Sequence, residues 1–288
     1  RSAYPDEFVR ALTEAGWLAA LIPAEYGGAG LGMAEASVIL EEINASGGNA
    51  AGAHAQMYTM GTVLRHGSEE QKRRFLPRIA KGELRLQAFG VTEPEAGSET
   101  TRIRTAAVKK DGRYVVSGKK IFISRTLQSD LLLLLARTTP YEELTDKTHG
   151  LSVFLVDLKA AVAAGTITIR PIETMLNHHT TELFIEGLEL APTDLVGVEG
   201  MGFRHIIDSW NAERILIASE SLGDGRWFIE RASRYASERV VFGRPIGANQ
   251  GVQFPLAQAH ASLAAATLVR DKAAWLFDQS RPCGAEAN

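Results

Sequence analysis

Residues 90–99, with the sequence GVTEPEAGSE, have a composition suited to holding a ligand. Thr92 and Ser98 carry small hydroxyl groups, and the neighbouring glycines allow the backbone to approach a bound molecule closely. Such a loop can offer backbone N–H groups and side-chain oxygens to a ligand. The ordinary alternative is a turn between two strands, because Glu93-Pro94 is a typical turn sequence.

Residues 211–214 (NAER) form a second candidate group, within a long helical stretch expected after Gly202. Neighbouring helical residues diverge by about 100°, so Glu213 and Arg214 do not pair on one face. Asn211 and Arg214 are three residues apart and share a face. A solvated side chain is the common interpretation of a helical glutamate, and a general base is the alternative.

Arg239 is the third candidate, in the stretch 238–242 (ERVVF). It is either a solvated cation at a helix end, where the macrodipole favours it, or a ligand for phosphate. A guanidinium group can contact a phosphate through two N–H groups at once, which a lysine does not reproduce.

Other familiar site patterns are incomplete. Residues 28–33 (GAGLGM) place Met33 where a dinucleotide fingerprint needs glycine, and no strand is expected before them. Residues 112–119 carry one residue too many between their glycines for a phosphate-binding loop. His178 and His179 are adjacent, so on an extended segment they point to opposite sides and are not expected to share a metal. The single cysteine, Cys283, excludes an intrachain disulfide.

Composition narrows the class of protein. The 288 residues include 31 basic and 34 acidic side chains, a formal charge of −3, which is not the electrostatic pattern of a nucleic-acid binder. No apolar run approaches the roughly 20 residues of a membrane helix, and the first residues, RSAYPDEF, lack the apolar core of a signal peptide. We expect a protein without nucleic-acid binding or membrane insertion, located in the cytoplasm, or in the mitochondrial matrix of a eukaryote.

The elements that must position these groups change in type along the chain. Residues 1–83 read as amphipathic helices, with a capping box at 68–71 (SEEQ) opening the last of them. Residues 84–198 read as short strands, and residues 199–288 as long helices ending in a frayed tail at 280–288. The strands are expected at 104–108, 113–116, 121–124, 131–136, 151–156, 166–170 and 182–185. We therefore predict an α+β protein with a central antiparallel barrel or sandwich between two helical domains.

Several motifs, in one order along the chain, resemble those of the acyl-CoA dehydrogenases. Residues 90–99 are similar to the family's TEPxAGSD segment, and 119–124 (KKIFIS) resemble its KxWIT strand. Residues 191–203 (APTDLVGVEGMGF) and 235–250 (YASERVVFGRPIGANQ) resemble two further passages, and 211–214 resemble the LDLER helix. Residues 22–30 (IPAEYGGAG) fit the family's early loop.

The resemblance implies a flavoprotein that holds flavin adenine dinucleotide (FAD) and forms a homo-oligomer, a tetramer or a dimer. It implies FAD contacts from the residues Phe89, Val91, Thr92, Ser98, Phe122, Ile123, Ser124, Arg239, Phe242 and Gln250. Of these, Arg239 and Gln250 would meet a flavin bound by a neighbouring subunit, with Phe242 at the same interface. Ser98, Asn211 and Arg214 would line the acyl-CoA site.

Some positions depart from the family's pattern. Phe122 and Ser124 replace a tryptophan and a threonine, which keeps an aromatic face and a hydroxyl group. Glu99 replaces the aspartate, and Arg102 stands where a small residue is usual. Residues 177–181 (NHHTT) replace a GxRxSxT pattern near the substrate entrance. The resemblance also implies that the chain is truncated at both ends.

The implied activity is removal of two hydrogens from an acyl-CoA thioester to give a trans-2-enoyl-CoA. Glu213 would take the α-proton, as in the isovaleryl-CoA and long-chain branches, and an electron-transferring flavoprotein would accept the electrons. Burial beside acyl chain and flavin would raise the pKa of Glu213. One alternative is a flavin oxidase or monooxygenase on the same fold, which rapid reoxidation by oxygen would reveal. Another is a non-catalytic acyl-CoA-binding fragment, which would stay colourless when incubated with flavin.

Overall fold

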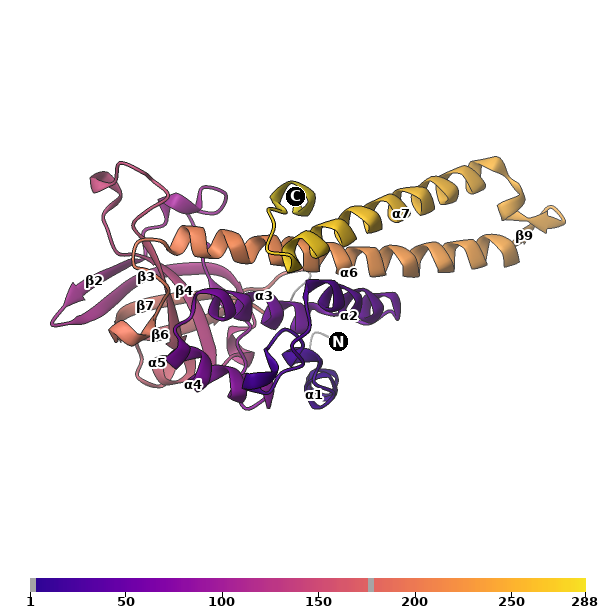
Figure 1. The fold of residues 1–288 in the computed structure, drawn as a ribbon. Helices are drawn as coiled ribbons and strands as arrows, with labels where there is room; N and C mark the ends of the chain where they lie inside the picture. The colour runs from indigo at the N-terminus through magenta and orange to yellow at the C-terminus, as the bar shows by residue number, and fades with distance from the viewer. Residues whose placement is uncertain (1–3, 176–178) are drawn as a thin grey trace. The chain divides into compact units, whose positions relative to one another are not determined.

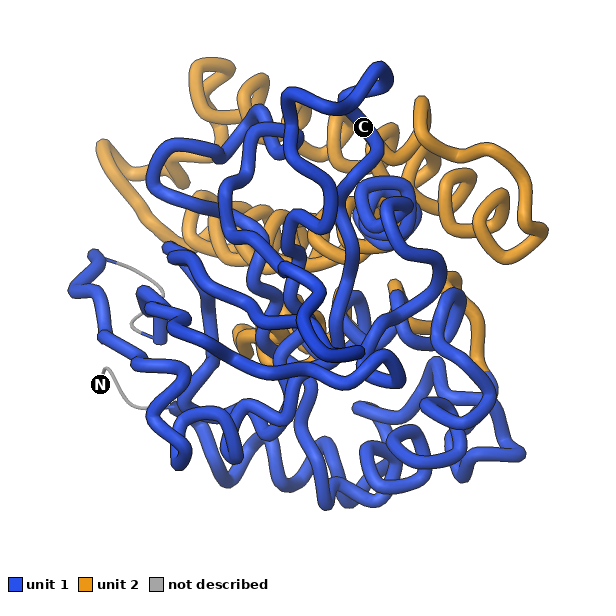
Figure 2. The backbone as a smooth tube through the Cα atoms, turned by 90° about the vertical axis from the view of Figure 1, so that its left-hand side faces the viewer, with its two compact units in different colours: residues 1–30, 55–210 blue, residues 31–54, 211–288 orange. Residues whose placement is uncertain are grey.

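The computed structural model describes residues 4–175 and 179–288, which form two compact units (Figure 2). Unit 1 comprises Arg1–Gly30 and Ala55–Trp210, and unit 2 comprises Leu31–His54 and Asn211–Asn288. Asn177 and His178, part of the segment that departs from the family's pattern near the substrate entrance, lie outside the described residues. Each unit is considered by itself below.

The helices of unit 1 follow the apolar periodicity of the sequence. They are α1 (Asp6–Glu14), most of α3 (Ala51–His66), α4 (Glu69–Ala80), α5 (Leu158–Ala163) and the start of α6 (Gly202–Glu238). The capping box before α4 is confirmed: Ser68 Oγ accepts from the Gln71 N–H at 3.1 Å, and the Gln71 side chain accepts from the Ser68 N–H at 3.0 Å. These bonds satisfy N–H groups that the first turn of a helix leaves without a helical partner.

The strands of unit 1 form one sheet in the order β6-β7-β3-β2-β4-β5-β8, with β1 pairing on β4. Their bounds are β1 (Ala88–Gly90), β2 (Ala106–Lys110), β3 (Arg113–Ser124), β4 (Leu131–Arg137), β5 (Leu151–Asp157), β6 (Ile167–Pro171), β7 (Thr180–Leu190) and β8 (Leu195–Val196). Both β1 and β2 pair with β4 in parallel, so the sheet is mixed where the sequence predicted antiparallel pairing throughout. Among the described strands β6 and β8 stand at the two ends of the order, so the sheet is not a closed barrel.

The apolar run in β4 is buried on both faces. Leu131, Leu133 and Leu135 pack with helical residues of unit 1 in one core, whereas Leu132 and Leu134 join a second core with residues of β3, β6 and β7. A strand between two cores needs a continuous apolar run rather than alternation. This explains the sequence LLLLLA and gives the sheet its sandwich-like packing.

The turn between β2 and β3 confirms the hairpin predicted at Asp111-Gly112. Both residues have positive φ, 48° and 76°. A two-residue hairpin of this kind needs two left-handed residues, and Asp-Gly is among the sequences that best tolerate them. The strand that follows is longer than predicted, because 113–116 and 121–124 are the two ends of the single strand β3.

Unit 2 is built from α2 (Met33–Ala45), the rest of α6, α7 (Gln250–Asp278) and α8 (Gly284–Ala287). The small strands β9 (Val240–Val241) and β10 (Arg244–Pro245) join α6 to α7, and Figure 1 shows these two helices as long antiparallel arms. The predicted frayed tail is wrong for 284–287, which are helical. There Glu286 forms an ion pair with Lys272 of α7 at 2.9 Å.

A buried ion pair holds the helices of unit 2 together. Glu41 of α2 accepts from Arg270 of α7 at 2.6 Å and from Arg226 of α6 at 2.9 Å. Gly223 lets α6 approach α2 closely, because a Cβ there would lie 2.3 Å from the Glu41 carbonyl oxygen. Burial by itself would raise the pKa of Glu41, but the hydrogen bonds from the two arginines outweigh burial and lower it.

No helix among the described residues has both the length and the apolar character required to cross a membrane.

We predict that Glu41→Gln lowers the free energy of unfolding by about 3 kcal/mol at pH 7, because the buried Arg270 then keeps only the exposed Asp271 as a counter-charge. Since folding lowers the pKa of Glu41, the wild type should lose this advantage as the pH falls through that lowered value. Urea unfolding at neutral and acid pH measures both effects. Glu230→Gln, which removes an exposed partner of Arg234, is the control and should cost less than about 1 kcal/mol. Equal losses in the two variants would contradict the prediction.

Candidate functional site

The loop after β1 is a tight turn held by backbone bonds. The N–H of Glu93 donates to the carbonyl of Ala96, and the N–H of Ala96 donates to that of Glu93, both at 3.1 Å. The turn expected at Glu93-Pro94 is therefore present. The turn comes directly after Val91 and Thr92, which follow the end of β1. It therefore fixes the positions of these two residues at the edge of the sheet.

The Glu93 carboxylate joins this turn to two other segments. It accepts from the backbone N–H groups of Arg104 at 2.6 Å and Thr105 at 2.9 Å. The ammonium group of Lys120, in β3, lies 2.9 Å from the same carboxylate and also donates to the Val91 carbonyl at 2.9 Å. One carboxylate thus ties the turn, the approach to β2 and the strand β3 together.

Burial and charge set the acidity of this pair. Lys120 is fully buried and Glu93 is 6% exposed. Burial alone would raise the pKa of Glu93, but the charge of Lys120 and the hydrogen bonds outweigh it and lower the pKa. Burial lowers the pKa of Lys120 to about 8, with the charge of Glu93 acting against this shift. Each partner therefore stabilises the charged form of the other.

An exposed aromatic ring lies next to the loop that follows β1. The N–H of Ile121 donates to the carbonyl of Thr92 at 2.9 Å, and the next residue, Phe122, has φ of 59°. The pairing of β3 with β7 shifts register between Lys120 and Ile123, so Phe122 sits on a bulge. Its side chain is 62% exposed. An open aromatic face beside backbone and hydroxyl groups fits a flat, partly polar ring system such as the isoalloxazine of FAD.

The predicted flavin residues of unit 1 differ in exposure. Ser98 is exposed, and Phe89, Thr92 and Ser124 are half-buried. Val91 and Ile123 point into the two cores of unit 1, so their side chains serve packing and only their backbone atoms remain as cofactor contacts. The structure thus brings 91–92 and 121–122 together through the Thr92–Ile121 bond.

In unit 2, Asn211 and Arg214 share a face as predicted: the guanidinium of Arg214 donates to the Asn211 side chain at 3.2 Å. Glu213 lies on a different side of the helix from Arg214 and is half-buried. Burial raises the pKa of Glu213, and the charges of His54 and Arg214 act against this rise. A carboxylate of raised pKa is a stronger base than a solvated one.

Arg239, Phe242 and Gln250 lie at the far end of the α6–α7 pair. Arg239 follows the last residue of α6, Gln250 is the first residue of α7, and both are exposed. Phe242 is fully exposed in the β9–β10 turn, with φ of 51°. An exposed guanidinium fits a phosphate, so these residues also suit a dinucleotide.

Sequence reasoning missed three buried titratable side chains, those of Lys120, His54 and Glu220. Lys120 lies two residues before Phe122 in β3, and the bulge between Lys120 and Ile123 separates its buried side chain from the exposed ring of Phe122. In unit 2, Nδ1 of His54 lies 3.1 Å from Oε1 of Glu220, and each of these residues is 8% exposed. A signal for His54 was available: it lies three residues before the buried Met57 on an amphipathic helix, and a histidine there is buried with the apolar face.

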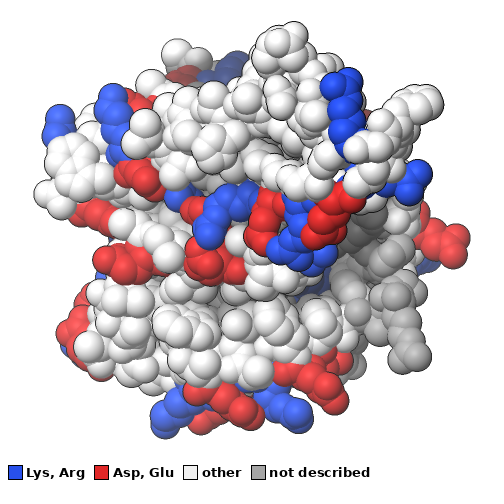
Figure 3. Space-filling model, turned by 90° about the vertical axis from the view of Figure 1, so that its right-hand side faces the viewer, with Lys and Arg blue, Asp and Glu red and all other residues white. Residues whose placement is uncertain are grey.

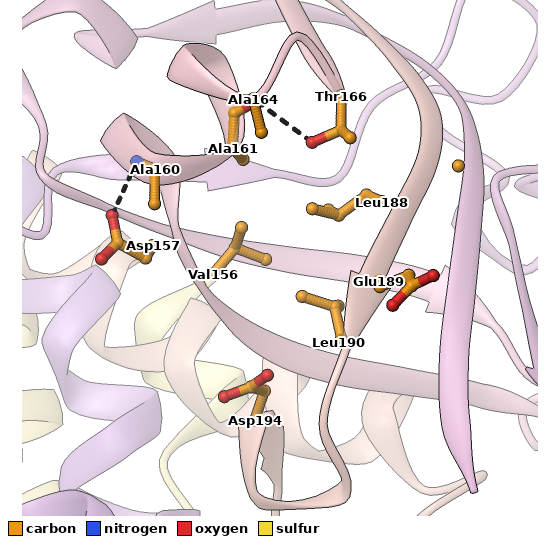
Figure 4. Close-up of a pocket in the computed structure, with 11 residues that line it drawn as sticks. Val156, Asp157, Ala160, Ala161, Ala164, Thr166, Leu188, Glu189, Leu190 and Asp194 are labelled. Atoms are coloured by element: carbon orange, nitrogen blue, oxygen red, sulfur yellow. Dashed lines mark hydrogen bonds between the residues drawn. The ribbon is translucent and has the colours of Figure 1, made fainter. Parts of the chain in front are cut away.

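A pocket of about 430 Å³ lies elsewhere in unit 1, between β5, α5 and β7 (Figure 4). Its carboxylates have local partners: Asp157 caps α5, Asp194 accepts from the Ala191 N–H, and Glu189 pairs with Arg113. None of the residues predicted for the flavin or the substrate lines it.

Acidic and basic side chains are intermixed on the face shown in Figure 3. This agrees with the nearly balanced composition.

Comparison with known families identifies the architecture. Three family models match in order: the acyl-CoA dehydrogenase N-terminal domain over residues 1–83, the middle domain over 88–188 and the C-terminal domain over 200–288. Together they cover nearly the whole chain.

Individual proteins agree with this match. The chain is 34% identical to an acyl-CoA dehydrogenase of Bacillus subtilis over 99% of its own length and 74% of the relative's. Butyryl-CoA dehydrogenase from Megasphaera elsdenii has the same fold (TM-score 0.90, 26% identity, 99% of this chain and 75% of that one). So does a chain of the structure described as the electron transferring flavoprotein of Acidaminococcus fermentans (TM-score 0.90, 29% identity, 99% and 74%). The chain therefore belongs to the acyl-CoA dehydrogenase family.

Proposed function

We propose that Glu213 is the catalytic base of this protein. The chain is an FAD-dependent oxidoreductase that converts an acyl-CoA thioester to a trans-2-enoyl-CoA. In this reaction the α-carbon loses a proton and the β-carbon loses a hydride. The single observation that supports Glu213 is its half-buried carboxyl group, whose pKa burial raises above the usual value. Desolvation strengthens the carboxylate as a proton acceptor, and the helix fixes its position.

Asn211 and Arg214 act as substrate-positioning groups in this proposal. The Arg214–Asn211 hydrogen bond fixes both side chains on one face of α6. Glu213 projects from a different direction of the same turn, so it is free of this bond. Ser98, exposed on the loop after β1, supplies a hydroxyl group for the coenzyme A portion.

The flavin surface of unit 1 consists of Thr92, Phe122 and Ser124, together with the half-buried Phe89 and the backbone of Val91 and Ile123. FAD, when bound, supplies the hydride acceptor. Phe122 offers its exposed face to the ring system, while Thr92 and Ser124 contribute hydroxyl groups that orient it. The buried Lys120–Glu93 pair keeps the two segments in place.

The protein assembles into homo-oligomers in this proposal, as a tetramer or a dimer. Arg239, Phe242 and Gln250 lie at the exposed end of the α6–α7 pair, where Arg239 and Gln250 serve the FAD of a neighbouring copy. Support comes from the apolar side chains exposed there. Val240 is 56% exposed, Val241 39% and Phe242 101%, which is typical of surfaces that become covered on association.

An electron-transferring flavoprotein accepts the electrons in this proposal, since a chain of the Acidaminococcus fermentans structure shares this fold.

The three matched family segments support three domains, at 1–83, 84–198 and 199–288.

We predict that Glu213→Gln retains FAD and acyl-CoA binding but reduces the rate of flavin reduction at least ~10²-fold, the low end for loss of a general base. Anaerobic bleaching of the flavin by acyl-CoA measures the rate, and Glu230→Gln on the exposed face of α6 is the control. Wild-type bleaching in Glu213→Gln would place the base at another residue.

Lys120→Met should weaken FAD retention and lower the free energy of unfolding by about 3–5 kcal/mol, because Glu93 then stays buried without its counter-charge. Adding Glu93→Gln removes the uncompensated charge and should recover part of the stability. Lys119→Met, at the neighbouring and more exposed lysine, is the control. FAD content after gel filtration and urea unfolding are the measurements, and equal effects at the two lysines would contradict the prediction.

Arg239→Lys should weaken FAD retention, because an ammonium group does not reproduce a two-point contact with phosphate. Arg234→Lys, an equally conservative change in the last turns of α6, is the control. FAD content is compared after dilution and gel filtration. If both variants retain FAD equally, Arg239 does not belong to the site.

A further inference from the structure

Two histidines of unit 1 stack against each other where α3 ends and α6 begins. His66 is the last residue of α3, and His205 lies in the first turn of α6. Their ring centroids are 4.2 Å apart, and the ring planes are inclined by 26°. At this distance a positive charge on one imidazole strongly opposes a positive charge on the other. The two histidines therefore do not take up protons independently.

The backbone packs closely around both rings. A Cβ at Gly197, in the loop after β8, would lie 2.4 Å from Cε1 of His205, so this loop packs directly on the ring. Gly67, which follows His66, is equally confined, because a Cβ there would lie 2.5 Å from the carbonyl oxygen of Val63. Only glycine allows these two approaches, and together they hold the stacked rings in place.

Polar contacts join the same two helices beside the stack. The hydroxyl groups of Thr62 and Ser209 share a hydrogen bond. The guanidinium of Arg65 donates to the main-chain carbonyl of Asp208 at 2.7 Å. Nε2 of His66 lies 3.3 Å from Oδ2 of Asp208. The stacked rings are therefore part of the contact that holds the end of α3 to the first turns of α6.

The charged side chains of these two helices favour a single proton on the pair. The carboxylate of Asp208 favours a charge on either ring, but its side chain is 55% exposed, so water screens it. Arg65, on α3, opposes a charge on His66. Arg204, next to His205 in the chain, is exposed. One carboxylate of this kind can compensate one positive charge and not two.

The surroundings of His205 also disfavour a proton. Its Nδ1 is buried and has no hydrogen-bond partner among the described residues. Glu199, the charged residue of the loop 197–201 that packs on this ring, is bound to Lys109 and Tyr114 instead. Protonation of Nδ1 would therefore bury an N–H group without an acceptor, which costs free energy beyond the repulsion between the rings.

We propose that the His66–His205 stack is a pH-sensitive contact, which holds the end of α3 to the start of α6 while at least one ring is neutral and weakens when mild acid brings a proton to both. Two imidazolium ions at this spacing repel each other, and the packed backbone prevents them from moving apart without opening the contact. The inference does not depend on the proposed role of Glu213.

The acidity of the two rings agrees with this geometry. Burial lowers the pKa of His66 and the charge of His205 lowers it further, while Asp208 acts in the opposite direction. Burial also lowers the pKa of His205, again against the charge of Asp208. As the pH falls through about 6.5, the usual histidine value, the unfolded chain therefore binds more protons than the folded one. The free energy of unfolding then decreases until the pH lies below the lowered pKa values of the folded protein.

Urea unfolding of the full chain from about pH 8 to about pH 5.5 measures this loss, above the range in which Glu41 titrates. The folding equilibrium constant of the wild type should fall roughly 3- to 10-fold more over this range than that of His205→Gln, because one linked proton changes the constant up to tenfold per pH unit. His66→Gln should behave like His205→Gln. His260→Gln, at an exposed histidine of α7, is the matched control and should keep the pH dependence of the wild type.

Histidine NMR tests the coupling between the rings directly. In protein labelled with ¹⁵N in the histidine rings, the resonances of His66 and His205 are assigned by their absence in the corresponding glutamine variants. In the wild type the pair should titrate in two separate steps, because the first proton opposes the second. In His205→Gln, the remaining ring of His66 should titrate in one step that is complete at higher pH.

Backbone hydrogen exchange shows where the protein opens. Peptides covering 60–67 and 202–210 should exchange faster at about pH 5.5 than at about pH 8, after correction for the chemical exchange rate, in the wild type and in His260→Gln. The difference should be smaller in His205→Gln, which cannot carry two charges at the contact.

Two results would overturn the inference. One is a single-step titration of both rings near the usual histidine pKa in the wild type. The other is a wild-type pH dependence of unfolding in the folded His205→Gln and His66→Gln proteins. If thermal unfolding shows that one variant does not fold, the other gives the same comparison, because either substitution removes one of the two charges.

Discussion

The geometry of the proposed flavin surface depends on the buried contact between Lys120 and Glu93. Two charges removed from water carry a large desolvation cost, and their attraction does not always repay it. Their value here is positional: Glu93 also binds the N–H groups of Arg104 and Thr105, and Lys120 also binds the Val91 carbonyl. No single apolar contact could fix three separate backbone segments with this directionality. The main effect of the pair is therefore to hold these backbone segments in fixed positions, rather than to add net stability.

The bulge at Phe122 allows Lys120 to be buried against Glu93 while Phe122 stays exposed. In a regular strand the side chains of Lys120 and Phe122 would lie on the same face of the sheet. Because Lys120 is buried, Phe122 would then be buried as well. The register shift between Lys120 and Ile123 and the positive φ of Phe122 break that regular pattern. Lys120 can then be fully buried while Phe122 is 62% exposed. Left-handed backbone costs energy at a phenylalanine, and such strain persists where the surroundings impose it.

Local signals in the sequence were sufficient for much of the fold and insufficient for the site. The capping box at Ser68 and the Asp111-Gly112 turn depend on neighbouring residues, so they were predictable. The parallel pairing of β1 and β2 on β4 depends on contacts between distant segments, and no local pattern reports it. The burial of Lys120 escaped prediction for the same reason, since its partner lies 27 residues away. Motif resemblance proposed Glu213 but carried no information about His54.

The pKa values of three carboxyl groups removed from water shift in different directions: those of Glu41 and Glu93 are lowered, and that of Glu213 is raised. Glu41 and Glu93 each face a buried cation and accept several hydrogen bonds, so their pKa values fall despite burial. Glu213 is also removed from water, yet its pKa rises, because nearby charges offset burial only in part. A carboxylate with close cationic partners is a weaker base than one whose pKa is raised. The direction of the shift at Glu213 is therefore the one that its proposed role in proton abstraction uses.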